Sequence, residues 1–172
     1  SYILTGYRDT TLTGDITTPG LFLMELSGDG TVLFDSLYYN EDPHHIMGRC
    51  IQPAIGGGYI IACSFLEDGG GTEQTMLTRL AKNKLGKFIH PTQPAYAIIP
   101  AGQSGYASWI SQYEDGYLLG GTAFRDMSTK YDLFIQKVDI NYDVMWTKLY
   151  GWADSDHFSV ALIVGDHIYI AG

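Results

Sequence analysis

Two short segments that pair aspartate with histidine hold the residue types best suited to chemistry in this 172-residue chain. Asp42 and His45 stand in the sequence Asp-Pro-His-His, and Asp154 and His157 stand in Asp-Ser-Asp-His. Each histidine lies seven residues after a tyrosine. Carboxylate and imidazole groups placed together can bind a sugar, a peptide or a metal ion. The same residue types also cap turns, and their recurrence agrees with a turn that every repeat needs, so both interpretations stand.

A weaker candidate for metal binding is the pattern Asp-x-Asn-x-Asp formed by Asp139, Asn141 and Asp143. It resembles the start of a calcium loop, in which alternate residues supply oxygen ligands. A complete loop needs further oxygen ligands, commonly a glutamate several residues on, and here apolar residues follow. The alternative is a plain turn, because reversing the chain favours Asn and Asp where no metal is bound.

Exposed tryptophan rings would suit a carbohydrate or protein ligand, since a flat ring buries a large area on contact. Trp152 lies among polar residues and is the ring expected to be exposed. Trp146 aligns with aromatic residues in two other repeats, which favours packing in the core. Asn40 stands where Trp152 would recur, so the sequence does not predict one sugar site per repeat.

The motifs of common enzymes are missing from the sequence. There is no G-x-S-x-G, no H-E-x-x-H, and no lysine with Ser or Thr after the three glycines at 69–71. We therefore predict no cofactor and assign no catalytic residue, although scattered Asp and His residues can still meet in space.

Charge and hydropathy narrow the choice of partners. The chain has 19 acidic and 10 basic residues, a net charge of −9. Nucleic-acid binding relies on clustered Lys and Arg, so this sign argues against it. No run of 18 apolar residues occurs, so no membrane insertion is expected.

A repeat supplies the elements that must position these residues. One short apolar unit occurs four times, as YILTG from Tyr2, YIIAC from Tyr59, YLLGG from Tyr117 and IYIAG from Ile168. Three further stretches align without a gap over fourteen residues, at 21–34, 75–88 and 133–146, and each ends on an aromatic residue. The repeats are 2–58, 59–116 and 117–167, with 168–172 starting a fourth, in a single repeat domain over 1–172.

Each repeat predicts four short antiparallel strands joined as a meander, which is the blade of a β-propeller. The fold class is therefore all-β, a partial propeller of about three four-stranded blades. The count is three strands of one blade, two whole blades and two strands of the next. Because propellers close with several blades, we expect a fragment of a larger ring, with the remaining blades of the same parent chain as its partners.

One stretch has a competing interpretation. Residues 72–85 space Met76, Leu77 and Leu80 as an amphipathic helix would. The aligned stretches contain β-branched residues and a Gly-Asp-Gly turn, which oppose a helix. We predict a hairpin.

The two cysteines flank the glycines at 56–58. If Gly56 and Gly57 form a two-residue turn, Cys50 lies opposite Cys63 in a non-hydrogen-bonded pair, with Cα atoms about 4.5 Å apart. That separation permits a disulfide in an oxidising compartment. The alternative is two small buried thiols.

The segment from Asp115 to Ser159 also resembles a known repeat. It contains GYLLGG, then DLFIQKVD, then VMWTKLYG, then DSDHFS. This pattern is similar to the propeller repeats of secreted and surface-attached bacterial proteins, often from Bacteroidetes-like organisms. The resemblance implies a propeller and a secreted or cell-surface location, and it implies little about activity.

In such a fold the segments with Asp42, His45, Asp154 and His157 lead from the outermost strand of one blade to the innermost strand of the next, where loops can line the mouth of the channel. With Trp152 they form the expected ligand-binding set. The leading hypothesis is a non-catalytic scaffold that binds protein or glycan. The alternatives are a hydrolase or lyase at the channel mouth and a structural spacer in an adhesin.

Overall fold

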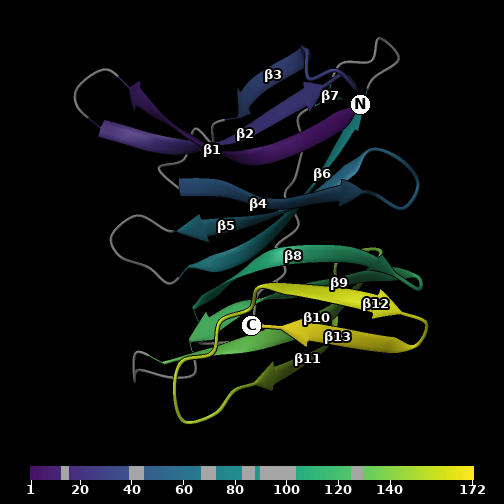
Figure 1. Ribbon diagram of the computed structural model, residues 1–172. Helices are drawn as coiled ribbons and strands as arrows, with labels where there is room; N and C mark the ends of the chain where they lie inside the picture. Colours follow the sequence, from purple (N-terminus) through teal and green to yellow (C-terminus); the bar gives the residue numbers. More distant parts are fainter. Residues whose placement is uncertain (13–15, 39–44, 67–72, 83–87, 90–103, 125–129) are drawn as a thin grey trace.

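The computed structural model describes residues 1–12, 16–38, 45–66, 73–82, 88–89, 104–124 and 130–172. All regular structure in these residues is β-strand, which confirms the all-β prediction. Figure 1 shows four separate antiparallel sheets. The described residues hold no helix long and apolar enough to cross a membrane.

The sheets follow one another along the chain. The first contains β1 (Tyr2–Leu12), β2 (Ile16–Leu26) and β3 (Val32–Tyr38). The second contains β4 (His45–Pro53), β5 (Tyr59–Leu66), β6 (Gln74–Lys82) and β7 (Phe88–Ile89). The third contains β8 (Gly105–Tyr113), β9 (Gly116–Phe124), β10 (Tyr131–Asp139) and β11 (Val144–Tyr150), and the fourth β12 (Val160–Val164) and β13 (His167–Ala171). Within each sheet consecutive strands are neighbours, so the expected meander and strand count are confirmed.

The first and third fourteen-residue stretches fold in the same register. Leu21 pairs with Tyr38 in the first sheet, and Leu133 pairs with Tyr150 in the third. Both hairpins shift register at the matching position near the turn. Position-by-position agreement of strand pairing shows that the sequence repeat is also a structural repeat.

The second stretch is also a pair of strands, so the helical alternative is wrong, but its return strand is displaced. β7 places Phe88 opposite Lys82, whereas the ungapped alignment would place it opposite Arg79. In the other two hairpins Ser27 and Asp139 bond the turn through side-chain oxygens. Alanine at the matching position 81 has no such oxygen, so β6 continues past the point where the other hairpins turn.

Three apolar layers join the four sheets face to face, and each contains residues from two successive sheets. The layer between the first and second sheets includes Leu23 and Cys63, and the layer between the third and fourth includes Leu118 and Phe158. The layer between the second and third sheets contains the following buried residues: Ala54, Ile60, Ala62, Leu77, Ala107, Ile110, Tyr117, Leu119, Ala123, Phe134 and Val138.

β5 shows how one strand serves two layers. Ile60 and Ala62 belong to the layer toward the third sheet, while Ile61 and Cys63 belong to the layer toward the first. This division follows from the period of two, which sends successive side chains to opposite faces. A strand covered on both faces reads as a continuous apolar run, and YIIAC is such a run.

Backbone hydrogen bonds also join the second and third sheets where β8 begins. The Gly105 N–H donates to the Glu73 carbonyl at 2.7 Å. The Ala107 N–H donates to Thr75 Oγ1 at 2.8 Å, and both residues are buried. Without the Thr75 hydroxyl this N–H would be buried with no acceptor.

The third and fourth sheets repeat that connection. The Asp156 N–H donates to the Tyr131 carbonyl at 2.8 Å, and the Phe158 N–H donates to Thr122 Oγ1 at 3.0 Å. Asp156 and Phe158 lie 51 residues after Gly105 and Ala107, and Tyr131 lies 58 after Glu73. The backbone–backbone bond therefore recurs at equivalent positions, whereas the hydroxyl acceptor comes from β6 in one case (Thr75) and from β9 in the other (Thr122).

The expected disulfide is not formed, since Cys50 and Cys63 are both free. The Ala54 N–H donates to the Gly58 carbonyl at 3.0 Å, so three residues, 55–57, form the turn in place of the predicted two, and a bulge at Arg49 shifts the register again. Cys50 therefore lies opposite Ala62 and faces the third sheet, whereas Cys63 faces the first. A one-residue slip moves a side chain to the other face, which separates the two thiols.

The sheets form an open stack within the described residues, and no closed ring is present. Contact between successive sheets involves their first strands, since β4 touches β8 and β8 touches β12. The segment from β11 to β12 crosses the end of the stack where β10 begins, which places several of the predicted ligand-binding residues there.

Candidate functional site

Residues 151–159, between β11 and β12, carry three of the five predicted ligand-binding residues. Trp152 is 75% exposed, and Asp154 and His157 are also exposed. The Trp152 N–H donates to Asp156 Oδ2 at 2.8 Å. The ring therefore projects from a segment whose backbone is held in place.

Further hydrogen bonds fix the same segment against the start of β10. Lys130 Nζ donates to the Ala153 carbonyl, and the Tyr131 N–H donates to Ser155 Oγ at 3.4 Å. The Asp156 N–H donates back to the Tyr131 carbonyl. Asp156 thus acts as a turn-forming residue, and the loop presents Trp152 without needing a ligand to order it.

His157 has a neighbour within the protein. Its ring centroid lies 4.8 Å from that of Tyr131, and Tyr131 in turn lies 4.2 Å from Phe124. One face of the imidazole is therefore covered. Of the predicted set, Trp152 and Asp154 are the side chains that face solvent most freely.

The earlier pair of the predicted set cannot be placed beside them. Asp42 lies outside the described residues, and His45 is described only through its backbone, which pairs with Leu66 at the start of β4. The two segments belong to the connections into the second and fourth sheets respectively. Whether they line one channel stays a prediction.

The Asp139 turn uses its carboxylate on its own backbone. Asp139 Oδ1 accepts the N–H of Asn141 at 2.8 Å and the N–H of Asp143 at 2.9 Å. This is the turn-forming role of aspartate, and Ser27 holds the matching position in the first sheet. Among the residues that the structure describes, no three His, Cys, Asp or Glu side chains are grouped to hold a metal ion.

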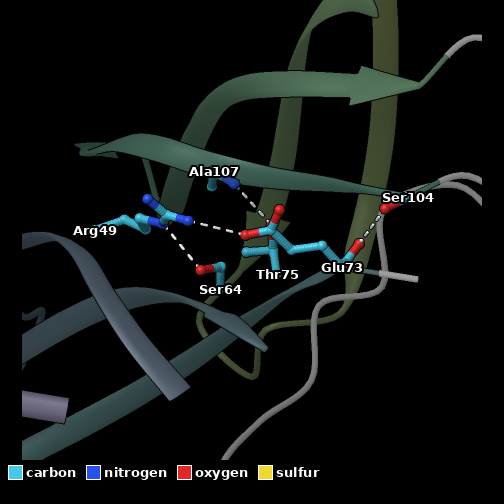
Figure 2. Close-up of polar contacts among 6 residues, drawn as sticks. All are labelled: Arg49, Ser64, Glu73, Thr75, Ser104 and Ala107. Carbon is cyan, nitrogen blue, oxygen red and sulfur yellow. Dashed lines mark hydrogen bonds and ion pairs between the residues drawn. The ribbon is translucent and has the colours of Figure 1, made fainter. Parts of the chain in front are cut away.

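A polar cluster that the sequence did not indicate joins the second and third sheets (Figure 2). Arg49 lies at the bulge of β4, and its Nη2 is 2.9 Å from Oε1 of Glu73. Its Nε donates to Ser64 Oγ at 2.9 Å. The guanidinium also lies 4.6 Å from the centroid of the Tyr106 ring.

The hydrogen bonds of this cluster hold the two sheets together. Ser104 Oγ donates to the Glu73 carbonyl at 3.2 Å, beside the bond from Gly105. Arg49 and Glu73 are each about three-tenths exposed, and they neutralise each other. The cluster therefore fastens the third sheet to the second. Sequence reasoning missed it because a bulge turned Arg49 toward a strand 57 residues away.

The described residues form hollows at two places that bear on function. One of about 460 Å³ lies between the third and fourth sheets and is lined by Ile135, Trp146, Lys148, Tyr150, Ile168 and Ile170. The other, of about 510 Å³, lies at the turn between β4 and β5 and is lined by Pro53, glycines 56–58, Tyr59, Arg79 and Ala81. The lining of the first hollow is mainly apolar. In the second, the Arg79 guanidinium lies against the backbone of the glycine turn.

No family model matches the sequence, and no curated protein matches it significantly.

Proposed function

We propose that this chain is part of a β-propeller from a secreted or cell-surface protein, and that it binds a protein or a glycan without catalysing a reaction. The propeller is supported by successive four-stranded sheets that stack through apolar layers with the same inter-sheet hydrogen bonds. The location is supported by the resemblance of residues 115–159 to surface-protein repeats.

One observation carries the binding function: the ring of Trp152 is 75% exposed on a loop fixed by hydrogen bonds. An exposed tryptophan adds contact area with few rotatable bonds to immobilise, so it is a frequent centre of binding energy. The exposed carboxylate of Asp154, two residues on, supplies a hydrogen-bond acceptor beside it. Sugar faces and protein surfaces both meet such a pair.

The experiment is a glycan array and a pull-down from extracellular material with the 172-residue chain, repeated with Trp152→Ala. Tyr7→Ala is the matched control, because it removes a ring that is 55% exposed on the first sheet. We expect a retained ligand whose affinity falls roughly tenfold or more in Trp152→Ala, as for a central aromatic contact, and is unchanged in Tyr7→Ala. A blank result in both assays, or equal binding by both variants, would contradict the proposal.

A further inference from the structure

The second and third sheets, which have four strands each, differ in the turn that lies beside a cation of their third strand. Arg79 of β6 and Lys137 of β10 lie 58 residues apart, as do Tyr59 and Tyr117. Arg79 pairs with Ile60 of β5, and Lys137 pairs with Leu118 of β9, which lies 58 residues after Ile60. They are therefore equivalent cations in equivalent sheets.

In the third sheet the turn neutralises the cation. Lys137 Nζ donates to Glu114 Oε2 and lies 3.7 Å from Asp115 Oδ1. The hydrogen bond that Lys137 donates to Glu114 raises the pKa of Lys137. The ammonium also lies 5.5 Å from the centroid of the Tyr113 ring. A nearly buried cation is thus satisfied by the two acidic residues of the adjacent turn.

In the second sheet the same turn positions hold glycine. Gly56 and Gly57 stand 58 residues before Glu114 and Asp115. A methyl group placed on Gly56 would lie 3.3 Å from Nη2 of Arg79, so a side chain there would meet the guanidinium. Arg79 donates to the Gly57 carbonyl at 2.9 Å, and among the described residues it has no carboxylate partner.

The backbone matches at the first turn position, although Gly57 and Gly58 also have positive φ and Asp115 and Gly116 do not. Gly56 has φ of 77° and Glu114 has φ of 52°, so both residues adopt the left-handed conformation. The glycine turn is one residue longer on its β4 side. Without the two acidic side chains the turn leaves the hollow of about 510 Å³ open beside Arg79.

We infer that this hollow is a binding site for a carboxylate, and that its ligand is an acidic peptide segment of a partner protein. The third sheet shows the chemistry that the position accepts, which is a Glu-Asp pair carried on polypeptide. Arginine suits an external ligand better than lysine, because its planar fork can hold both oxygens of one carboxylate. The inference is independent of the function proposed for Trp152, since no residue of the segment between β11 and β12 lines this hollow.

The test is a titration of the full chain with N-acetyl-Glu-Asp-amide, followed by the backbone amide NMR signals of residues 56–58 and the Arg79 Nε–H. We expect saturable shifts with a Kd on the order of millimolar, as two hydrogen bonds to a charged group, worth about 1.5–3 kcal/mol each, would give. Arg79→Gln should weaken binding roughly tenfold or more. Lys148→Gln, which removes one exposed positive charge elsewhere, should bind as the original chain does.

Further measurements test whether a peptide carboxylate is the group that binds. N-acetyl-Gln-Asn-amide should not bind, and Trp152→Ala should bind the acidic peptide normally. Gly56→Glu should abolish peptide binding, because it supplies the carboxylate from the turn, as Glu114 does. Binding of glucuronate without the peptide, equal binding by Arg79→Gln, or no saturable shift in the original chain would each overturn the inference.

Discussion

Replacing Gly120 of β9 with alanine tests how closely the fourth sheet packs on the third. A methyl group at Gly120 would lie 2.5 Å from Cε2 and 3.1 Å from Cε1 of the Phe158 ring. Phe158 is only 8% exposed, so the ring cannot move aside without disturbing the apolar layer. Alanine itself suits this strand position, since Ala62 holds it in the second sheet.

Two opposing effects set the magnitude. Overpacking a buried site costs about 1–3 kcal/mol. Replacing glycine in a strand interior returns about 0.5–1 kcal/mol, because glycine loses more backbone entropy on folding. We therefore expect Gly120→Ala to lower the free energy of unfolding by about 1 kcal/mol. If the fourth sheet did not pack against Gly120, the same substitution would raise the free energy of unfolding.

Gly6→Ala in β1 is the matched control. No heavy atom lies within 4 Å of the position that its methyl group would take. Only the entropy effect remains there, and we expect a gain of about 0.5–1 kcal/mol. The opposite signs at two matching strands distinguish packing from intrinsic strand preference.

The assay is urea unfolding followed by tryptophan fluorescence and far-UV circular dichroism. The three tryptophans, at positions 109, 146 and 152, lie in the third sheet or in the segment after it. Fluorescence therefore reports unfolding in the region of Gly120, and circular dichroism also covers the region of Gly6. A cycle with Phe158→Leu should give a coupling energy of at least about 1 kcal/mol, because the smaller side chain relieves the contact. A stabilising Gly120→Ala, or no coupling, would refute the stacking geometry.

Three further predictions follow from the described residues. Thr75→Val should lower the free energy of unfolding by about 1–3 kcal/mol, because it leaves the buried Ala107 N–H without an acceptor. Hydrogen exchange of the Ala107 amide checks this, and Thr75→Ser should restore the protection of that amide. Burial raises the pKa of both cysteine thiols, Cys63 most, so iodoacetamide at pH 8 should modify the folded chain slowly, and both cysteines should react on unfolding without a reductant. A hydrogen bond from the Ser27 hydroxyl is the main cause that lowers the pKa of Asp29 to about 2. The Asp29 carboxylate therefore stabilises its turn fully above pH 3.8 and loses this effect as the pH falls through 2. An NMR titration of Ser27→Ala should show the pKa of Asp29 returning toward 3.8.

The strand order was predictable because it depends on local signals that recur. A short apolar unit occurs four times and a fourteen-residue strand–turn–strand stretch three times, and agreement among copies outweighed the helical spacing of residues 72–85. The register was less predictable. One added turn residue and the bulge at Arg49 moved Cys50 to the other face, and nothing in the local sequence marks a bulge.

The candidate site was predictable only where exposure follows from polar neighbours. That reasoning placed Trp152 correctly at the surface, because its segment contains few apolar residues. It did not anticipate that Tyr131 would cover His157, or that Arg49 would meet Tyr106, since both contacts join different strands. Contacts of this kind depend on how the strands are placed in space.

Differences between repeats therefore carry more functional information here than agreements do. The Glu73 and Tyr131 carbonyls accept equivalent inter-sheet bonds, and hydroxyls from two different strands, Thr75 and Thr122, accept the next bond, so these agreements belong to the stacking. Stacking does not require a bare turn beside Arg79, because the third sheet stacks equally well with Glu114 and Asp115 there. A cation kept while its internal partner is replaced by glycine leaves a charge that a ligand can satisfy. The alignment of Gly56 with Glu114 already held this signal in the sequence. The structure adds that a side chain at position 56 would meet the cation of its sheet, as Glu114 does in the third sheet.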